Sequence, residues 1–201
     1  MEAYESFVAV ALAEEGFVVS EAAKFPVKLK TNKAAYDEYQ THGFEVDLVA
    51  ARSDRLVLAT VKSFFGSRGV VSAHVIGTTS DAAARKRYAL LNDPTVRSTV
   101  IGAAAKRYGY RVGQVELRLY VGRFAGPTQG HHEQAIRKWC RTQRVGRGPI
   151  RVFDVNAVLA QVRQAATQRQ YRDNAVLVTM KVLESAGVLT LKLPDDIGLG
   201  D

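Results

Sequence analysis

The alternation of hydrophobic and polar positions is clearest between Gly43 and Gly69, where it predicts two strands joined by a short turn. Alternation puts Phe44, Val46 and Leu48 on one face of the first strand and Glu45, Asp47 and Val49 on the other. Residues 52–55 form a polar turn, and residues 56–64 are rich enough in apolar and β-branched types for a buried strand. The pattern therefore predicts a hairpin within a sheet.

Two charged residues stand inside this predicted hairpin. Asp47 lies in the middle of the first strand, and Lys62 lies near the end of the second, on the same face as Thr60. Because a buried charge is costly unless it is paired, such residues need a reason to be there. The hairpin alone leaves two interpretations open, a structural ion pair at the end of the sheet and a catalytic site.

The same reasoning predicts elements along the rest of the chain. An apolar stripe predicts a helix over residues 2–16, and residues 17–31 predict a strand in which Pro26 favours an edge position. Alternation over residues 114–124 predicts a half-buried strand, whereas residues 70–76 fit a short strand or an ordered loop. The other expected elements are a helical turn near residues 36–39, helices over 82–91, 95–108, 131–144, 155–170 and 175–186, and short strands over 150–153 and 189–193.

Length and composition narrow the class of protein. A chain of 201 residues with 47% hydrophobic residues suits one domain with an elaboration, or two small domains. The single cysteine, Cys140, excludes an intramolecular disulfide and a cysteine-rich zinc site. No apolar run is long enough to span a bilayer and no signal-peptide pattern is present, so we expect a soluble cytoplasmic protein without a membrane partner.

Charge is divided unevenly along the chain, whose formal net charge is +8. Residues 1–66 hold 7 Lys and Arg against 10 Asp and Glu, whereas residues 67–201 hold 21 against 10. An acidic first third followed by a basic remainder suggests carboxylates gathered in one part and a surface for a polyanion in the other. Ordinary solubilising charge is the competing explanation.

Three basic segments are candidates for phosphate contact. Residues 66–69 join two glycines to Arg68, a pattern that fits either a phosphate-holding loop or a simple turn. The predicted helix 82–91 carries Arg85 and Lys86. Residues 134–153 contain no acidic residue and surround Trp139 with Arg137, Lys138, Arg141, Arg144 and Arg147. This segment is the strongest nucleic-acid candidate, although Trp139 could equally be core and the arginines a solvated face.

The predicted order of helix, three strands, helix and strand, with an acid on the first helix and then Asp and Lys on the hairpin, resembles the PD-(D/E)XK restriction-endonuclease-like superfamily. Residues 4–8 and 12–19 look like the opening helix of its resolvase-like branches. The resemblance covers roughly residues 1–125 and implies an αβββαβ core with a mixed central sheet flanked by helices. Residues 126–201 would then form a basic extension of helices and a strand packed on that core.

The resemblance also implies a site. The family's acids converge on one or two Mg²⁺ ions, which would make Glu5 the helix acid, Asp47 the central metal ligand and Lys62 the residue that positions or activates water. The family's acid-x-Lys triplet is Thr60-Val61-Lys62 here, so its acid is missing. Since Mg²⁺ prefers anionic oxygen ligands, Glu45 would stand in, with the Val61 carbonyl adding an oxygen. The alternative is a degraded metal site in a surviving fold.

The activity implied by the resemblance is hydrolysis of a DNA phosphodiester assisted by Mg²⁺ or Mn²⁺. A homodimer would let each chain act on one strand. Two other classes of function stay open at this point. One is an inactive nuclease-fold protein that binds DNA without cutting it, and the other is a protein-interaction module whose positive charge is incidental.

Overall fold

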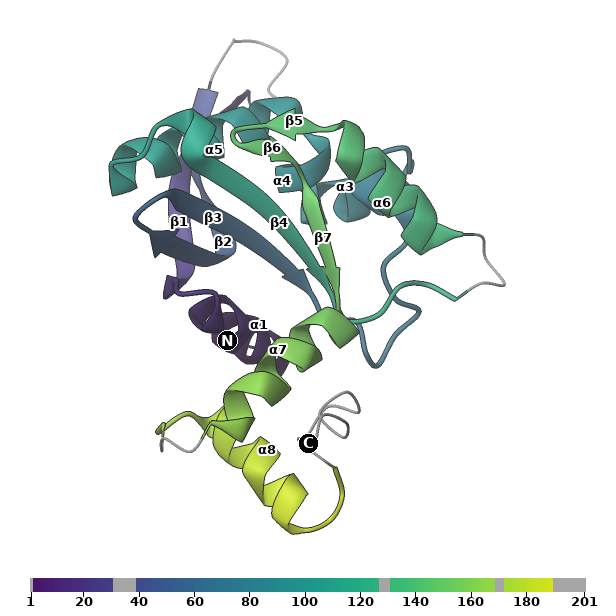
Figure 1. Cartoon of the computed structure of the whole chain (residues 1–201). Helices are drawn as coiled ribbons and strands as arrows, with labels where there is room; N and C mark the ends of the chain where they lie inside the picture. The colour runs from purple at the N-terminus through teal and green to yellow at the C-terminus, as the bar shows by residue number, and fades with distance from the viewer. Residues whose placement is uncertain (1, 31–38, 127–130, 169–171, 190–201) are drawn as a thin grey trace.

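A mixed five-stranded sheet runs through the centre of the structure (Figure 1). This computed structural model describes residues 2–30, 39–126, 131–168 and 172–189. The strands are β1 (Val18–Lys30), β2 (Tyr39–Arg52), β3 (Arg55–Lys62), β4 (Val115–Val121) and β7 (Arg151–Asp154). They lie in the order β1-β2-β3-β4-β7, the first three antiparallel and the last three parallel. Pro26 therefore does lie on an edge strand, where a missing N–H costs least.

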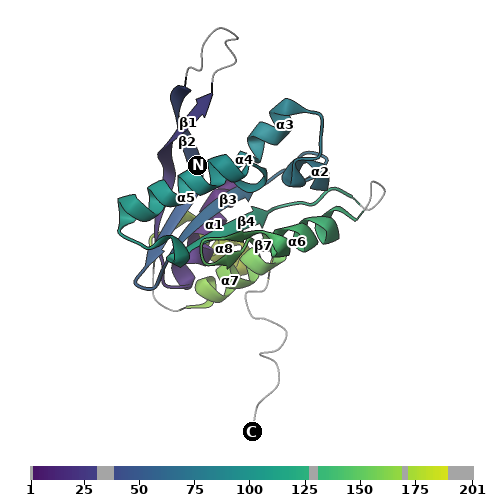
Figure 2. The same cartoon turned by 90° about the horizontal axis from the view of Figure 1, so that it is seen from above.

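Helices cover both faces of the sheet and enclose two hydrophobic cores (Figures 1 and 2). One core is closed by α1 (Ala3–Glu14), α7 (Val155–Thr167) and α8 (Ala175–Ser185). The other is closed by α2 (Ser72–Ile76), α4 (Ala89–Asn92), α5 (Pro94–Tyr108) and α6 (His132–Thr142). The smaller elements are α3 (Ala82–Arg87), the 3₁₀ turn η1 (Val112–Gln114) and a two-stranded hairpin of β5 (Arg144–Val145) and β6 (Gly148–Pro149).

Side-chain caps explain where several helices begin. The carboxylate of Asp81 accepts from the amides of residues 83 and 84, and Asp93 and Asp154 cap α5 and α7 in the same way. The helix expected over residues 82–91 is split in two at Tyr88, and residues 70–76 contain α2 instead of a short strand. The helical turn expected near residues 36–39 and the strand expected over 189–193 fall largely outside the described residues.

The pairing of β1 with β2 is interrupted at one place. Glu21 pairs with Leu48 and Ala23 with Val46, so the ladder omits Ala22 and Asp47 between them. Ala22 takes a positive φ of 48°, which departs from the extended geometry of a regular strand. In consequence Leu48 lies in the α1 core, whereas Val46 lies in the α5 core. The expectation that Leu48 and Val46 share a face is therefore wrong, because strict alternation ends at Asp47.

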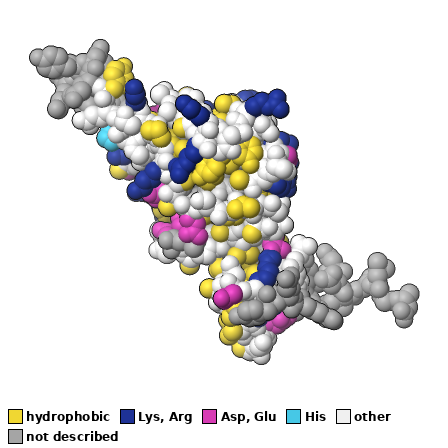
Figure 3. All heavy atoms as spheres, turned by 90° about the vertical axis from the view of Figure 1, so that its left-hand side faces the viewer, with side chains coloured by type: hydrophobic (Ala, Val, Ile, Leu, Met, Phe, Trp, Pro, Cys, Tyr) yellow, Lys and Arg dark blue, Asp and Glu magenta, His cyan; other side chains and the backbone are white. Residues whose placement is uncertain are grey.

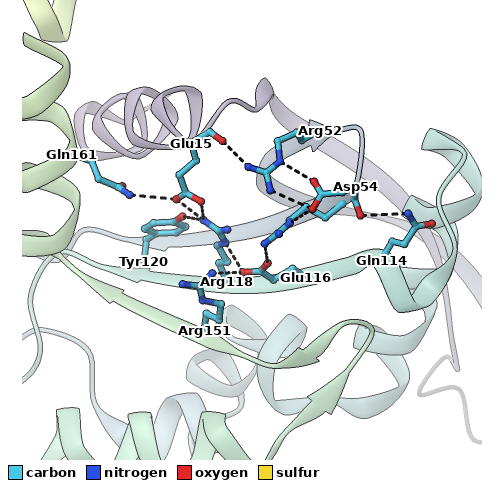
Figure 4. A network of polar contacts seen from close by, with 10 residues as sticks. Glu15, Arg52, Asp54, Gln114, Glu116, Arg118, Tyr120, Arg151 and Gln161 are labelled. Atoms are coloured by element: carbon cyan, nitrogen blue, oxygen red, sulfur yellow. Dashed lines mark hydrogen bonds and ion pairs between the residues drawn. The ribbon is translucent and has the colours of Figure 1, made fainter. Parts of the chain in front are cut away.

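Strand β4 is buried on both faces, and not half-buried as its alternation predicts. The guanidinium of Arg118 is fully buried and donates to Glu15 and to Glu116 at 2.7 Å each (Figure 4). It also lies 5.5 Å from the Phe17 ring centroid. Glu116 also accepts from Arg151 at 3.2 Å. The polar positions of β4 can be covered by α1 and α7 because their charges are paired with one another.

Glu116 makes the stability of the fold depend on pH. Burial raises its pKa, but Arg118 and then Arg151 outweigh burial and hold the pKa below the ordinary value of 4.5. A carboxyl group whose pKa is lowered in the folded protein stabilises the fold above pH 4.5. This contribution is lost as the pH falls through the lowered pKa. We expect Glu116→Gln to destabilise the protein at pH 7 by about 3 kcal/mol, by leaving Arg118 short of a counter-charge.

Urea unfolding at several pH values checks this expectation. The loss of unfolding free energy on acidification should be smaller in Glu116→Gln than in the wild type. Glu45→Gln is the matched control, because Glu45 is exposed and its pair with Lys24 at 3.6 Å should contribute about 1 kcal/mol or less. Equal pH profiles for Glu116→Gln and the wild type would contradict the assignment.

Candidate active site

Residues from α1, β2 and β3 meet at an open cavity of about 630 Å³, at the end of the sheet where β2 and β3 stop pairing. Three carboxylates line it, Glu2 and Glu5 from the start of α1 and Asp47 from β2. Two cations, Lys62 and Arg87, line it as well. The rest of the described lining is Val61, Ser63, Phe64, Phe65, Gly66 and Ser67.

The Asp47 side chain takes the place of the next rung between β2 and β3. The last paired residues are Leu48 and Ala59. Beyond them, Oδ2 of Asp47 accepts from the Val61 amide at 2.6 Å and from the Thr60 hydroxyl at 3.1 Å. Lys62 Nζ lies 3.4 Å from the same oxygen. The strands can therefore separate without leaving the Val61 N–H unsatisfied, which opens the cavity at this point.

The backbone of β3 presents an oxygen to the same gap. The Lys62 carbonyl accepts from the Gly122 amide at 2.9 Å, so it faces the β4 side. The N–H and C=O of one strand residue face the same neighbour, and successive residues alternate between neighbours. Val61, whose N–H reaches Asp47, therefore also directs its carbonyl towards β2 and the cavity it lines.

The first turn of α1 is fixed against the ends of β3 and β4. Tyr4 donates from its hydroxyl to the Val121 carbonyl at 3.3 Å, and burial raises the pKa of this phenol well above its ordinary range. Glu5 accepts from the Glu2 amide at 3.0 Å, and the Glu2 carboxylate accepts from the Ser63 hydroxyl at 2.9 Å. Anchoring by Tyr4 thus brings both carboxylates to the cavity that Asp47 lines.

The backbone is strained on both sides of the Asp47 interruption. Among the described residues other than glycine, only Ala22 and Phe64 have positive φ, each at 48°. Ala22 lies opposite Asp47 in the broken ladder, and Phe64 lines the cavity two residues after Lys62. Strain of this kind costs about 1–3 kcal/mol per residue and concentrates at functional sites, which marks this end of the sheet.

The donor set fits a hard divalent cation. Carboxylates and a backbone carbonyl are the oxygen ligands that Mg²⁺ and Mn²⁺ take, and the cavity offers Glu2, Glu5, Asp47 and the Val61 carbonyl. The carboxylates come from two elements, α1 and β2, and among the described residues no three acidic, His or Cys side chains form a ready cluster. A cation would have to draw them together and compete with Lys62 for Asp47.

Glu45 does not belong to this arrangement. It is exposed, pairs with Lys24 at 3.6 Å, and lies outside the described lining of the cavity. The expectation that Glu45 replaces the missing acid is not supported, because the interruption at Asp47 ends the regular alternation that would have put both carboxylates on one face. Glu2, three residues before Glu5 on the helix, is the acid that reaches the cavity instead.

The predicted basic residues are scattered over several surfaces. Arg137 is engaged within the protein by Glu133 at 2.8 Å and Asp154 at 2.7 Å. Lys138 and Arg141 are exposed and line a second cavity, of about 600 Å³, along α6. Arg68, Arg85, Lys86, Arg144 and Arg147 are exposed on loops, on α3 and around the β5–β6 hairpin. Figure 3 shows a further face, where most visible Lys and Arg side chains lie in the upper half.

Sequence reasoning did not assign five of the described cavity residues to the site, namely Glu2, Ser63, Phe64, Phe65 and Arg87. The helical spacing of Glu2 and Glu5 was a usable signal. Arg87 follows Arg85 and Lys86 in the chain. It is the last residue of α3, and it is the one of these three that lines the cavity.

Neither the patterns of known protein families nor the curated protein sequences match this chain. None of the described helices combines the length and hydrophobicity that a membrane crossing requires.

Asp47 should contribute to stability as well as to the site. Asp47→Ala leaves the Val61 amide and the Thr60 hydroxyl without their acceptor, and we expect a loss of about 1–3 kcal/mol in unfolding free energy. Asp47→Asn keeps an acceptor oxygen and should lose less than Asp47→Ala. Urea unfolding measures both variants, and equal losses would mean that the carboxylate does not replace the rung.

Proposed function

We propose that this protein is a metal-dependent DNA endonuclease of the restriction-endonuclease-like class. The observation that carries the proposal is the meeting of Glu5, Asp47 and Lys62, from α1, β2 and β3, at one cavity. These are the three positions that the resemblance assigns to the reaction. The order of elements supports it too, since a helix precedes three antiparallel strands and helices separate β3 from β4, which lies parallel to it.

Charge balance explains why such a site would need a metal. The described lining has one more carboxylate than cations, so it would repel a phosphodiester by itself. A divalent cation held by Asp47, the Val61 carbonyl and Glu5 or Glu2 would reverse this balance, polarise the phosphate and lower the pKa of a bound water. Lys62 and Arg87 stabilise the negative charge that builds up on the phosphate during attack.

A second candidate is a nuclease-fold protein that binds DNA without cutting it. One observation favours it, namely that Asp47 is already satisfied by Val61, Thr60 and Lys62. Thr60 donates a hydrogen bond at the position where the family has an acid. In this case a cation would bind only weakly, and the contacts of Asp47 would serve only to stabilise the fold. For either candidate we also propose a homodimer.

Cleavage assays separate the two candidates. The purified protein with Mg²⁺ or Mn²⁺ should cut DNA, and Asp47→Asn or Lys62→Met should each slow cutting by at least about 100-fold. Labelled duplex, single-stranded and branched DNA should all be tested with each metal and with a chelator.

Glu45→Gln is the matched control for Asp47→Asn, because it neutralises an exposed carboxylate two residues away on the same strand. It should cut at the wild-type rate. Cutting that survives in Asp47→Asn or Lys62→Met would remove the site assignment, and binding without cutting under every divalent ion would favour the second candidate.

Salt dependence tests the basic surface of α6. Lys138 and Arg141 are exposed, line the cavity along α6 and have no ion pair with another described residue. If both contact phosphates, replacing both with Ala should lower the slope of log K against log salt by about 2. Lys106→Ala with Arg111→Ala removes two exposed charges near the C-terminal end of α5 as a control. An unchanged slope in the α6 variant would place the DNA elsewhere.

A further inference from the structure

Phe65 occupies an unusual position for an aromatic side chain. It is 51% exposed and lies three residues after Lys62, the last residue of β3. It lines the candidate active-site cavity and also a neighbouring groove of about 450 Å³, and Glu2 and Ser63 line both as well. Phe65 is therefore part of the wall between the two.

Three features hold the ring in place. The Tyr4 ring meets it edge-on, with centroids 5.2 Å apart and planes at 85°. A Cβ at position 122 would lie 2.4 Å from the Ser63 carbonyl oxygen and 2.7 Å from the Phe65 ring, so Gly122 leaves room for both the backbone turn at Ser63 and the ring beside it. Phe64, directly before it, has a φ of 48°. A half-exposed ring held by a strained neighbour and a glycine contributes little burial, so packing alone does not account for it.

The groove beside Phe65 is apolar, whereas the cavity on its other side is charged. Ala3, Tyr4 and Phe7 of α1 and Val155 and Leu159 of α7 supply its other described apolar walls. The two spaces together suit a ligand that has a flat apolar part joined directly to an anionic part. A nucleotide has this construction, with a base beside a phosphate, and bases stack on exposed aromatic rings.

We propose that an unpaired nucleobase of the DNA stacks on Phe65 and enters this groove while its phosphate lies in the candidate active-site cavity. The inference rests on the proposed function and gives it a substrate class. A base inside a duplex is not free to leave its stack without an energetic cost, so the site selects DNA with single-stranded or branched segments. The continuity of the groove with the charged cavity favours a nucleotide over a second copy of this chain as occupant.

Binding measurements with Ca²⁺ test the proposal apart from cleavage. Fluorescence anisotropy compares a labelled single strand, a duplex with a single-stranded tail and a fully paired duplex. Phe65→Ala should weaken binding of the first two by about 5- to 150-fold and leave the paired duplex unchanged. Phe65→Leu should lose nearly as much, because it keeps an apolar side chain without a π face. Tyr39→Ala is the matched control, an exposed aromatic at the far end of β2.

A 2-aminopurine base, moved along the tail, locates the contact. One position next to the single-stranded junction should change its emission on binding, and Phe65→Ala should abolish that change. Equal losses for paired and unpaired DNA, or no loss, would overturn the inference while wild-type cutting still upheld the proposed function. If the wild type binds no DNA, both fail. A dimer that Phe65→Ala converts to monomers, measured by sedimentation, would assign the groove to a second copy and also overturn the inference.

Discussion

The candidate site depends on one hydrogen bond in the sheet, in which a side-chain carboxylate takes the place of a backbone carbonyl as the acceptor. The Asp47 carboxylate accepts a hydrogen bond from the Val61 N–H at 2.6 Å. Strands β2 and β3 can therefore separate at this point without leaving that amide unsatisfied. The separation makes the cavity, directs the Val61 carbonyl into it and leaves Lys62 beside the carboxylate. An ordinary rung at this point would close the sheet and remove the site.

The rest of the fold keeps that end of the sheet in position. Tyr4 ties the first turn of α1 to the end of β4, which brings two further carboxylates to the cavity. Further along β4, Arg118 is enclosed by Glu15 and Glu116, so α1 and α7 can cover polar positions of the strand. Helix α1 is therefore fixed near both of its ends by polar contacts with β4. We regard this double attachment as the reason that the α1 acids face the cavity.

Most of the fold could be predicted from the sequence, because hydrophobic periodicity and capping residues decide where long elements begin and end. The hairpin, the helices at both ends and the edge position of Pro26 follow in this way. The interruption at Ala22 and Asp47 could not, since a positive φ at an alanine leaves no local signal. This interruption removes the regular alternation on which the choice of Glu45 as a ligand rested, and it puts Leu48 on the opposite face from Val46. The burial of β4 depends on pairing between distant residues such as Glu15 and Arg118, which no local pattern reports.

We propose that the gap opened by Asp47 is a site for a divalent cation. Anomalous diffraction from crystals grown with Mn²⁺ tests it most directly, because it locates the ion without reference to activity. We expect a peak at a coordination distance of about 2.1 Å from the Asp47 carboxylate and the Val61 carbonyl, with Glu5 or Glu2 completing the set. A crystal grown with saturating Mn²⁺ that shows no peak in this cavity, or that binds Mn²⁺ only at another surface, would contradict the proposed cation site.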